Sequence, residues 1–223
     1  MSPKLKKTRA RSEEKKDEQF ERIVEKGKEL FLKRGTKGFS MRNLAEMLSM
    51  TKNNLYNYIE SKRELWIAIR NRFYKQFKDE NVKILKSHDG SSIELLMKIC
   101  RHFFEFAERD FGVFIMMHAL TSAPTSEKVG KFEEKYREFR LLDGTTNLIK
   151  KAMEKNEIQE GNPAIIALFL YSLLFGAVYI DMNRREKIPI LENIQLSIAD
   201  VSSQGFQEYV LKILDKLLKE DLL

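Results

Sequence analysis

The stretch that decides the fold is residues 40–59, SMRNLAEMLSMTKNNLYNYI. Apolar residues stand in it only at helical packing positions: Met41, Leu44, Ala45, Leu48, Leu55 and Ile59. Ser40 precedes the first group and is a good N-cap. This spacing predicts two short helices, over 41–48 and 51–59, joined by a turn of three to four residues. That combination is a helix-turn-helix.

The outer side of the second predicted helix is polar and carries no acid. It presents Thr51, Lys52, Asn53, Tyr56, Asn57 and Tyr58. Side chains of these types reach base edges and phosphates in a major groove. No acidic residue occurs between Glu46 and Glu60, although 33% of the chain is charged. This favours a nucleic-acid surface over an ordinary polar helix face.

Charge is divided unevenly along the 223 residues, which carry a net charge of +7. Residues 1–78 hold 21 Lys/Arg against 10 Asp/Glu, and residues 79–223 hold 19 against 23. A uniformly charged surface of the heat-adapted kind would raise both signs everywhere. The polarised pattern instead indicates a basic head that binds a polyanion and a mildly acidic body.

The periodicity of the remaining chain predicts an all-α protein of about nine helices. Gly35 and Gly38 end a first helix that starts near Phe20, and Ser61 with Glu64 form a capping box for a fourth that continues to about residue 86. Further helices are predicted near 93–107, 112–120, 127–155, 163–183 and 203–220. We therefore expect a basic arm at 1–18, a helix-turn-helix domain at 19–64 and a helical ligand-binding and dimerisation domain at 65–223.

Enzyme motifs are absent from the sequence, which contains no phosphate-binding glycine loop, nucleophile elbow or zinc signature. Cys100 and His102 are two residues apart and would point to different sides of a helix. A single cysteine suits a reducing compartment, and the basic N-terminus has no apolar stretch behind it. We expect a cytoplasmic protein that is no enzyme and uses neither cofactor nor metal.

Residues 21–65 resemble the DNA-binding domain of the tetracycline-repressor (TetR) family of transcriptional regulators. The matching positions are Ile23, Leu30, Phe31, Gly35, Ser40, Leu44, Ala45, Thr51, Leu55, Tyr56, Tyr58, Ile59, Ser61, Lys62 and Leu65. The resemblance implies that Ser40 and Lys62 meet phosphates and that the outer residues of the second helix divide between bases and backbone. The chain departs from the family pattern in two places: Lys26 and Gly27 stand where alanines are common, and Ser49 stands where a turn glycine is common.

Two further assignments extend the predicted DNA surface. Arg42 is added because it is expected to be exposed beside Ser40. The arm residues Lys4, Lys6, Lys7, Arg9 and Arg11 either follow the DNA or form a solubilising tail, and the sequence leaves this open.

A two-fold dimer is expected, because one helix-turn-helix reads only a few base pairs. The apolar helices near 163–183 and 203–220 are the natural interface, pairing with their copies as a four-helix bundle. The run 164–180 could also be read as a membrane span. It has 17 residues where a span needs about 20, and Asp181 follows it at once. We therefore expect a helix of the protein interior and no membrane.

A ligand cavity is predicted in the body, where Phe and Met are frequent. Candidate contacts for an apolar or amphipathic molecule are His102, Phe103, Phe106, Phe114, Met117, His118, Phe139 and Tyr171. Taken singly, each of these aromatic and methionine residues is more often plain core, and each histidine is more often a core or surface residue than a ligand contact.

The function predicted from these patterns is a ligand-responsive, homodimeric DNA-binding regulator, a repressor released from a palindromic operator by a small molecule. Two alternatives stay open at the level of sequence. One is a nucleoid-type protein that binds any DNA through charge. The other is an apolar-ligand carrier or interaction module with a non-functional head.

Overall fold

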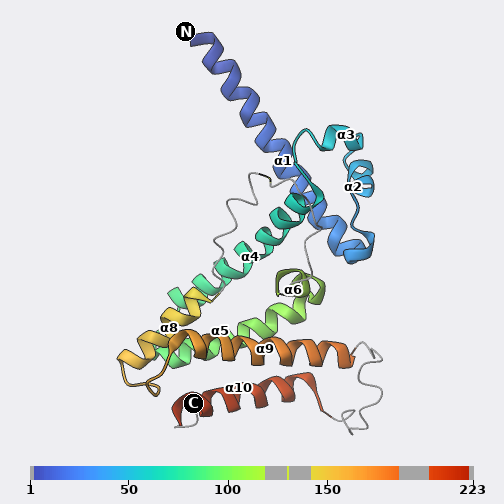
Figure 1. Cartoon of the computed structure of the whole chain (residues 1–223). Helices are drawn as coiled ribbons and strands as arrows, with labels where there is room; N and C mark the ends of the chain where they lie inside the picture. The colour runs from blue at the N-terminus through green and yellow to red at the C-terminus, as the bar shows by residue number, and fades with distance from the viewer. Residues whose placement is uncertain (1–2, 119–129, 131–141, 186–200, 221–223) are drawn as a thin grey trace. The chain divides into compact units, whose positions relative to one another are not determined.

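A computed structural model describes residues 3–118, 130, 142–185 and 201–220. These residues form nine α-helices and no strand, which confirms the predicted all-α class (Figure 1). The helices are α1 (Pro3–Gly38), α2 (Met41–Met47), α3 (Lys52–Leu55), α4 (Lys62–Lys86), α5 (Ser92–Arg109), α6 (Phe111–His118), α8 (Asp143–Glu154), α9 (Pro163–Arg185) and α10 (Ser203–Lys219).

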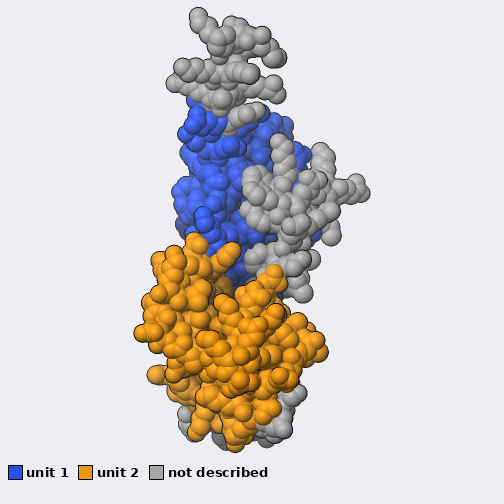
Figure 2. All heavy atoms as spheres, turned by 90° about the vertical axis from the view of Figure 1, so that its left-hand side faces the viewer, with its two compact units in different colours: residues 1–75, 115–139 blue, residues 76–114, 140–223 orange. Residues whose placement is uncertain are grey.

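The chain divides into two compact units, coloured separately in Figure 2. Unit 1 comprises residues 1–75 and 115–139, and unit 2 comprises residues 76–114 and 140–223. Helices α4 and α6 each supply residues to both units. The division into 1–18, 19–64 and 65–223 that was expected from the sequence stays a prediction.

Unit 1 is built around α1, with α2, α3 and the first half of α4. Its apolar core includes Ile23, Leu44, Leu55 and Leu65, which are all inaccessible to solvent. Gly27 lies where α1 meets α4, because a Cβ at this position would stand 2.7 Å from Ile69 Cδ1. The glycine that departs from the family pattern thus allows the two helices to approach closely.

Helix α1 is interrupted near its end. Gly35 has φ 61° and ψ −167°, a conformation that is essentially restricted to glycine. Helical geometry resumes after this residue as far as Gly38. The predicted break at Gly35 is therefore a kink within α1.

The start of α4 is capped much as its sequence predicts. Ser61 Oγ accepts a hydrogen bond from the Glu64 N–H at 3.0 Å, and the Glu64 carboxylate accepts one from the Glu60 N–H at 2.6 Å. The carboxylate thus holds the residue that precedes the cap. This arrangement joins the end of the helix-turn-helix firmly to α4.

Unit 2 is centred on α5, which packs against α8, α9 and α10. One face of α5 is buried, including Leu96, Cys100, Phe104 and Ala107. A capping box of Ser91 and Glu94 starts the helix. Figure 1 shows α10 running beside α9.

The helix expected over 127–155 can be followed only in part. Helix α8 begins at Asp143, the weak point in the periodicity, and ends at Glu154. Residues 127–129 and 131–141 lie outside the described part of the chain.

Candidate nucleic-acid interface and ligand site

The helix-turn-helix is held by side-chain caps at both helix starts. Ser40 Oγ accepts the Asn43 N–H at 3.1 Å, and Thr51 Oγ1 accepts the Asn54 N–H at 3.1 Å. Each hydroxyl keeps its own proton, which can be donated to a phosphate oxygen. The two predicted residues therefore fix the helix ends and still offer one donor each.

The turn between α2 and α3 places Ser49 at φ 55°, in the left-handed region. The Ser49 N–H donates to Glu46 O at 3.1 Å, and the Met50 N–H donates to Ala45 O at 2.9 Å. These two bonds form a Schellman motif, in which the left-handed residue is usually glycine. Serine thus adopts the glycine conformation, and the turn geometry is retained.

Helix α3 is shorter than the predicted 51–59. Its α-helical part is Lys52–Leu55, after which Asn57 N and Tyr58 N donate to carbonyls three residues back. The tighter turn keeps Leu55 and Ile59 buried beneath it. The predicted DNA-contacting residues of this segment are solvent-exposed, namely Thr51, Lys52, Asn53, Tyr56 and Asn57. Tyr58 is half-buried.

Arg42 and Lys62 flank this surface in different environments. The Arg42 side chain is 85% exposed, and its Nε lies 3.2 Å from Glu46 Oε1. Lys62 is half-buried, with Nζ 5.6 Å from the centre of the Phe39 ring. Helix α1 begins at Pro3 and thus includes most of the predicted arm, whose side chains up to residue 13 lie outside the description.

In the body, five of the predicted ligand residues lie in unit 2: His102, Phe103, Phe106, Phe114 and Tyr171. Four of these are buried, and Tyr171 is half-buried. The Phe103 ring centre lies 5.1 Å from that of Phe114 and 6.2 Å from that of Tyr171, both edge to face. These residues thus form one aromatic cluster between α5, α6 and α9.

Met117 and His118 belong to unit 1, and both are buried. The Tyr74 hydroxyl donates to Met117 O, and the His118 ring lies edge-on to Tyr74, with centres 5.9 Å apart. Burial lowers the pKa of His118 to about 4. Phe139, the eighth predicted residue, lies outside the described residues.

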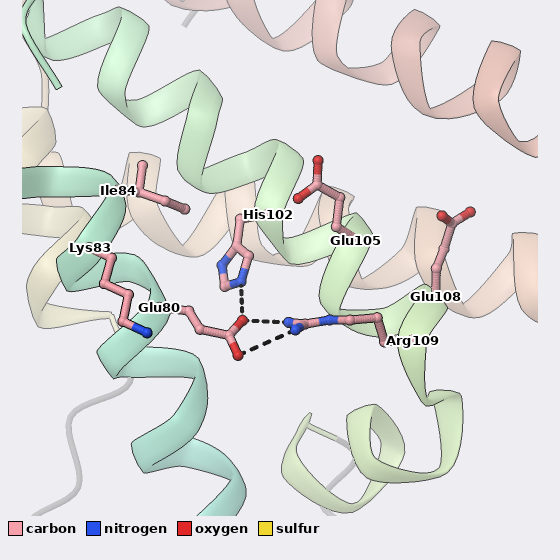
Figure 3. Close-up of a pocket in the computed structure, with 7 residues that line it drawn as sticks. All are labelled: Glu80, Lys83, Ile84, His102, Glu105, Glu108 and Arg109. Carbon is pink, nitrogen blue, oxygen red and sulfur yellow. Dashed lines mark hydrogen bonds and ion pairs between the residues drawn. The ribbon is translucent and has the colours of Figure 1, made fainter. Parts of the chain in front are cut away.

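His102 lies at a surface pocket of about 590 Å³ between α4 and α5 (Figure 3). Its Nε2 lies 2.8 Å from Glu80 Oε2, and its Nδ1 lies 2.8 Å from Asn81 Oδ1. The Arg109 guanidinium hydrogen-bonds both oxygens of Glu80, which together with His102 lowers the pKa of Glu80 to about 2. The pocket lining is mostly charged, unlike the apolar cavity that was predicted around His102.

Helix α9 is only partly buried within the single chain. It is long and apolar enough to cross a membrane, a test that core helices also pass, but only 28% of its most apolar window is buried within the chain. Exposed residues recur along one stripe: Ile165, Leu168, Ser172, Leu173, Tyr179 and Ile180. Tyr209 on α10 is exposed as well. This stripe, here called the α9 stripe, is an apolar surface that a single chain leaves uncovered.

Metal ligands and reactive thiols are not gathered in the part of the chain that is described. No group of three or more His, Cys, Asp or Glu side chains that could hold a metal occurs there. Burial raises the pKa of the Cys100 thiol to about 12, so this cysteine is unreactive near neutral pH.

A comparison with known protein families finds a match in the basic N-terminal part of the chain. Residues 23–69 match the family model described as "Bacterial regulatory proteins, tetR family". No curated protein sequence matches the chain significantly. The match covers Ser40, the turn and the whole exposed face of α3.

Several solved structures are similar to this chain in fold over both its N-terminal part and its body. A TetR/AcrR-family transcriptional regulator from Thermobifida fusca has a TM-score of 0.57 at 18% identity, covering 91% of this chain and all of its own. AibR, solved with isovaleryl coenzyme A and operator DNA, has a TM-score of 0.56 at 19% identity, covering 87% and 96%. RolR, solved with resorcinol, has a TM-score of 0.64 at 12% identity, covering 94% and 91%.

At these identities the structures show the fold, whereas the family model identifies the head by its sequence. The exposed, acid-free surface of α3 lies within the residues that match the family model. Residues 23–69 therefore match the tetR family of bacterial regulatory proteins, and the chain shares the fold of the TetR/AcrR-family regulator and the other two solved structures.

Proposed function

We propose that this protein is a homodimeric transcriptional repressor that leaves a palindromic operator when a small molecule binds its body. The observation that carries the proposal is the exposed surface of α3. Lys52, Asn53, Tyr56 and Asn57 face solvent with no carboxylate among them, above the buried Leu55 and Ile59. Such a surface suits a major groove, where hydrogen-bonding side chains read base edges and carboxylates are repelled by phosphate.

The second subunit of the dimer would cover the α9 stripe. Leu168 is 55% exposed and Ile165 is 65% exposed on a helix of mostly apolar sequence, an arrangement that a monomer in water disfavours. Pairing α9 and α10 with their copies would bury this surface in a four-helix bundle. This burial also removes the need for a membrane, and we place the protein in the cytoplasm.

The effector would be an apolar or amphipathic molecule. The aromatic cluster of Phe103, Phe106, Phe114 and Tyr171 provides large flat apolar surfaces, against which such a molecule can pack. AibR and RolR, which have this fold, were solved with isovaleryl coenzyme A and resorcinol. The protein would act by binding alone and would not be an enzyme.

Release from DNA would be a two-state equilibrium. The effector favours a separation of the two heads that no longer matches successive major grooves, so DNA and effector oppose each other. A coupling of about 1–3 kcal/mol would lower operator affinity roughly 5- to 150-fold.

The recognition surface is tested by Lys52→Ala and Tyr56→Ala, measured by fluorescence anisotropy on the duplex upstream of the protein's own gene. Each variant is expected to bind about tenfold or more weakly, because each removes a contact worth roughly 1–3 kcal/mol. Lys78→Ala is the control, since it removes another exposed lysine from the part of α4 that lies outside both the α3 surface and the proposed interface. Unchanged affinity in both head variants would refute the assignment of α3.

Specificity is tested by competition with a scrambled duplex of equal length at fixed salt. A regulator prefers the upstream duplex, whereas a nucleoid-type protein binds both equally. Ligand binding without any DNA binding at low salt would favour the carrier alternative.

A further inference from the structure

The surface of α3 carries two asparagines whose side-chain amides contact each other. Asn57 Nδ2 donates a hydrogen bond to Asn54 Oδ1 at 3.3 Å, and both residues are exposed to solvent. Asn54 was not among the residues expected to contact DNA. A side chain that a neighbour already holds in one direction has less freedom to lose when it binds.

The backbone supports this arrangement of the two asparagines. Thr51 Oγ1 accepts the Asn54 N–H at 3.1 Å, and the Asn57 N–H donates to Asn54 O at 3.2 Å. Leu55, which lies between them in the sequence, is inaccessible to solvent. Asn54 and Asn57 are therefore joined by a backbone bond and a side-chain bond, on a turn that is anchored in the core of unit 1.

Hydrogen-bonding groups of the pair remain available to a partner. An asparagine amide has two donor protons on nitrogen and an acceptor oxygen. Asn57 uses one proton on Asn54 within the described part of the chain, which leaves one Nδ2 proton and the Oδ1 acceptor. The Asn57 amide thus presents one donor beside one acceptor to solvent.

One donor beside one acceptor matches a single base in the major groove. Adenine presents the N7 acceptor and the N6 amino donor there, whereas guanine presents two acceptors, thymine an acceptor and a methyl group, and cytosine a donor. Guanine is read most often by arginine or lysine, and residues 51–59 contain no arginine. The chemistry of this surface therefore favours adenine.

We propose that Asn57 reads an adenine in each half of the operator and that Asn54 orients the Asn57 amide for this contact. The inference deepens the proposed function, on which it rests, by naming a base that the α3 surface selects. Asn57 Nδ2 would donate to adenine N7, and Asn57 Oδ1 would accept from the N6 amino group. Asn54 is a positioning residue, because it acts through Asn57.

The half-site is first defined by selecting duplexes from a randomised library with the unaltered protein. Each A·T pair in one half of the selected site is then changed in turn to G·C, and affinity is measured by fluorescence anisotropy at fixed salt. At the pair that Asn57 reads, the change should weaken binding by the unaltered protein about 5- to 150-fold. Asn57→Ala should bind both duplexes nearly equally, because it lacks the amide that distinguishes them. A half-site without such a pair would overturn the proposal.

A base analogue at the same position gives a second readout. 7-Deazaadenine removes the N7 acceptor and leaves the base pair with thymine intact. It should weaken binding by the unaltered protein roughly 2- to 10-fold, the effect of one hydrogen bond, and leave Asn57→Ala unaffected. The same analogue at an adenine outside the selected site is the control and should change neither affinity. An equal response by both proteins at the tested position would assign N7 to another side chain and overturn the proposal.

Asn54→Ala tests the positioning role. The variant should show a smaller preference for adenine at this pair, with its affinity for a scrambled duplex unchanged. A merely structural role would lower the Tm and weaken binding to both duplexes alike. Asn53→Ala is the matched control, since it removes the neighbouring exposed asparagine of α3 and should keep the full preference. A preference that is intact in Asn54→Ala, or lost in Asn53→Ala, would contradict the assignment.

Failure of this inference and failure of the regulator function can be told apart. A protein that selects a defined half-site in which Asn57 distinguishes no adenine would remain a sequence-specific regulator, and only the inference would fall. A protein that selects no sequence from the library would remove the regulator function and the inference with it.

Discussion

His118, the last residue of α6, is a neutral side chain held in the interior. Its ring is 7% exposed and lies edge-on to Tyr74. Burial lowers its pKa from 6.5 to about 4, because the charged ring would lose its hydration. The neutral form is therefore part of the folded state.

The stability of the fold should depend on pH through His118. A folded pKa below the unfolded value of 6.5 gives stability that is present above pH 6.5 and lost as pH falls through about 4. Between neutral pH and pH ~4.5 the free energy of unfolding should fall by about 2–3 kcal/mol from this residue. Urea titrations at the two pH values measure the difference.

The control for this pH effect is His118→Phe, which keeps a ring against Tyr74 and cannot be protonated. The variant should lose most of that pH dependence. An equal loss of stability in both proteins would assign the effect to other groups.

Single residues also account for what sequence reading missed. Glu80, Asn81 and Arg109 were not among the predicted residues of the body, yet Glu80 and Asn81 hydrogen-bond His102, and Arg109 hydrogen-bonds Glu80. Only the structure brings these side chains of α4 and α5 together.

Among the elements, the turn between α2 and α3 forms its usual hydrogen bonds although a serine occupies the position where glycine is common. Ser49 takes the left-handed conformation at φ 55°, and the two Schellman hydrogen bonds form around it. A side chain in this region costs roughly 1–2 kcal/mol relative to the right-handed form. The helix-turn-helix thus holds a serine at an unfavourable position.

Ser49→Gly should therefore stabilise the head. The gain in the free energy of unfolding is expected to be about 0.5–1 kcal/mol, because relief of the left-handed strain exceeds the added freedom of the unfolded chain. Thermal or urea unfolding measures it.

Asn156→Gly is the matched comparison for Ser49→Gly. Asn156 has the same φ of 55° and the same pair of hydrogen bonds, at the end of α8. Asparagine tolerates this region, so its replacement should gain less. A larger gain at Asn156 than at Ser49 would contradict this explanation.

At the scale of the whole molecule, the proposed dimer would cover the α9 stripe and would pair two basic heads. Leu168→Glu places a charge in the stripe and should dissociate the dimer at concentrations where the unaltered protein is dimeric. Leu85→Glu is matched in exposure, 54% against 55%, but lies on α4 outside the stripe. Sedimentation or light scattering gives the mass of each.

Dissociation should also weaken operator binding, because one head reads only half of a palindrome. A Leu168→Glu protein that stays dimeric, or an unaltered protein that is monomeric at all concentrations, would refute the proposed interface.

The sequence by itself determined the helical class, most helix boundaries and the family of the head. Periodic apolar residues and caps such as Ser40, Ser61 and Pro163 act over a few positions, so they can be read from neighbours in the chain. The same local character explains the expected start of α10 and the break at Gly35.

Tertiary structure alone decided which side chains are buried and which hydrogen-bond partners they have. His102 was a candidate for the core, the surface or a ligand contact, and the structure shows that it hydrogen-bonds Glu80 and Asn81, 22 and 21 residues away, beside a charged pocket. The 164–180 run was expected to lie in the interior and at a dimer interface, and within the single chain it is only partly buried, with the α9 stripe exposed. Burial and pairing depend on residues brought together from distant parts of the chain, and the order of residues does not specify those distances directly.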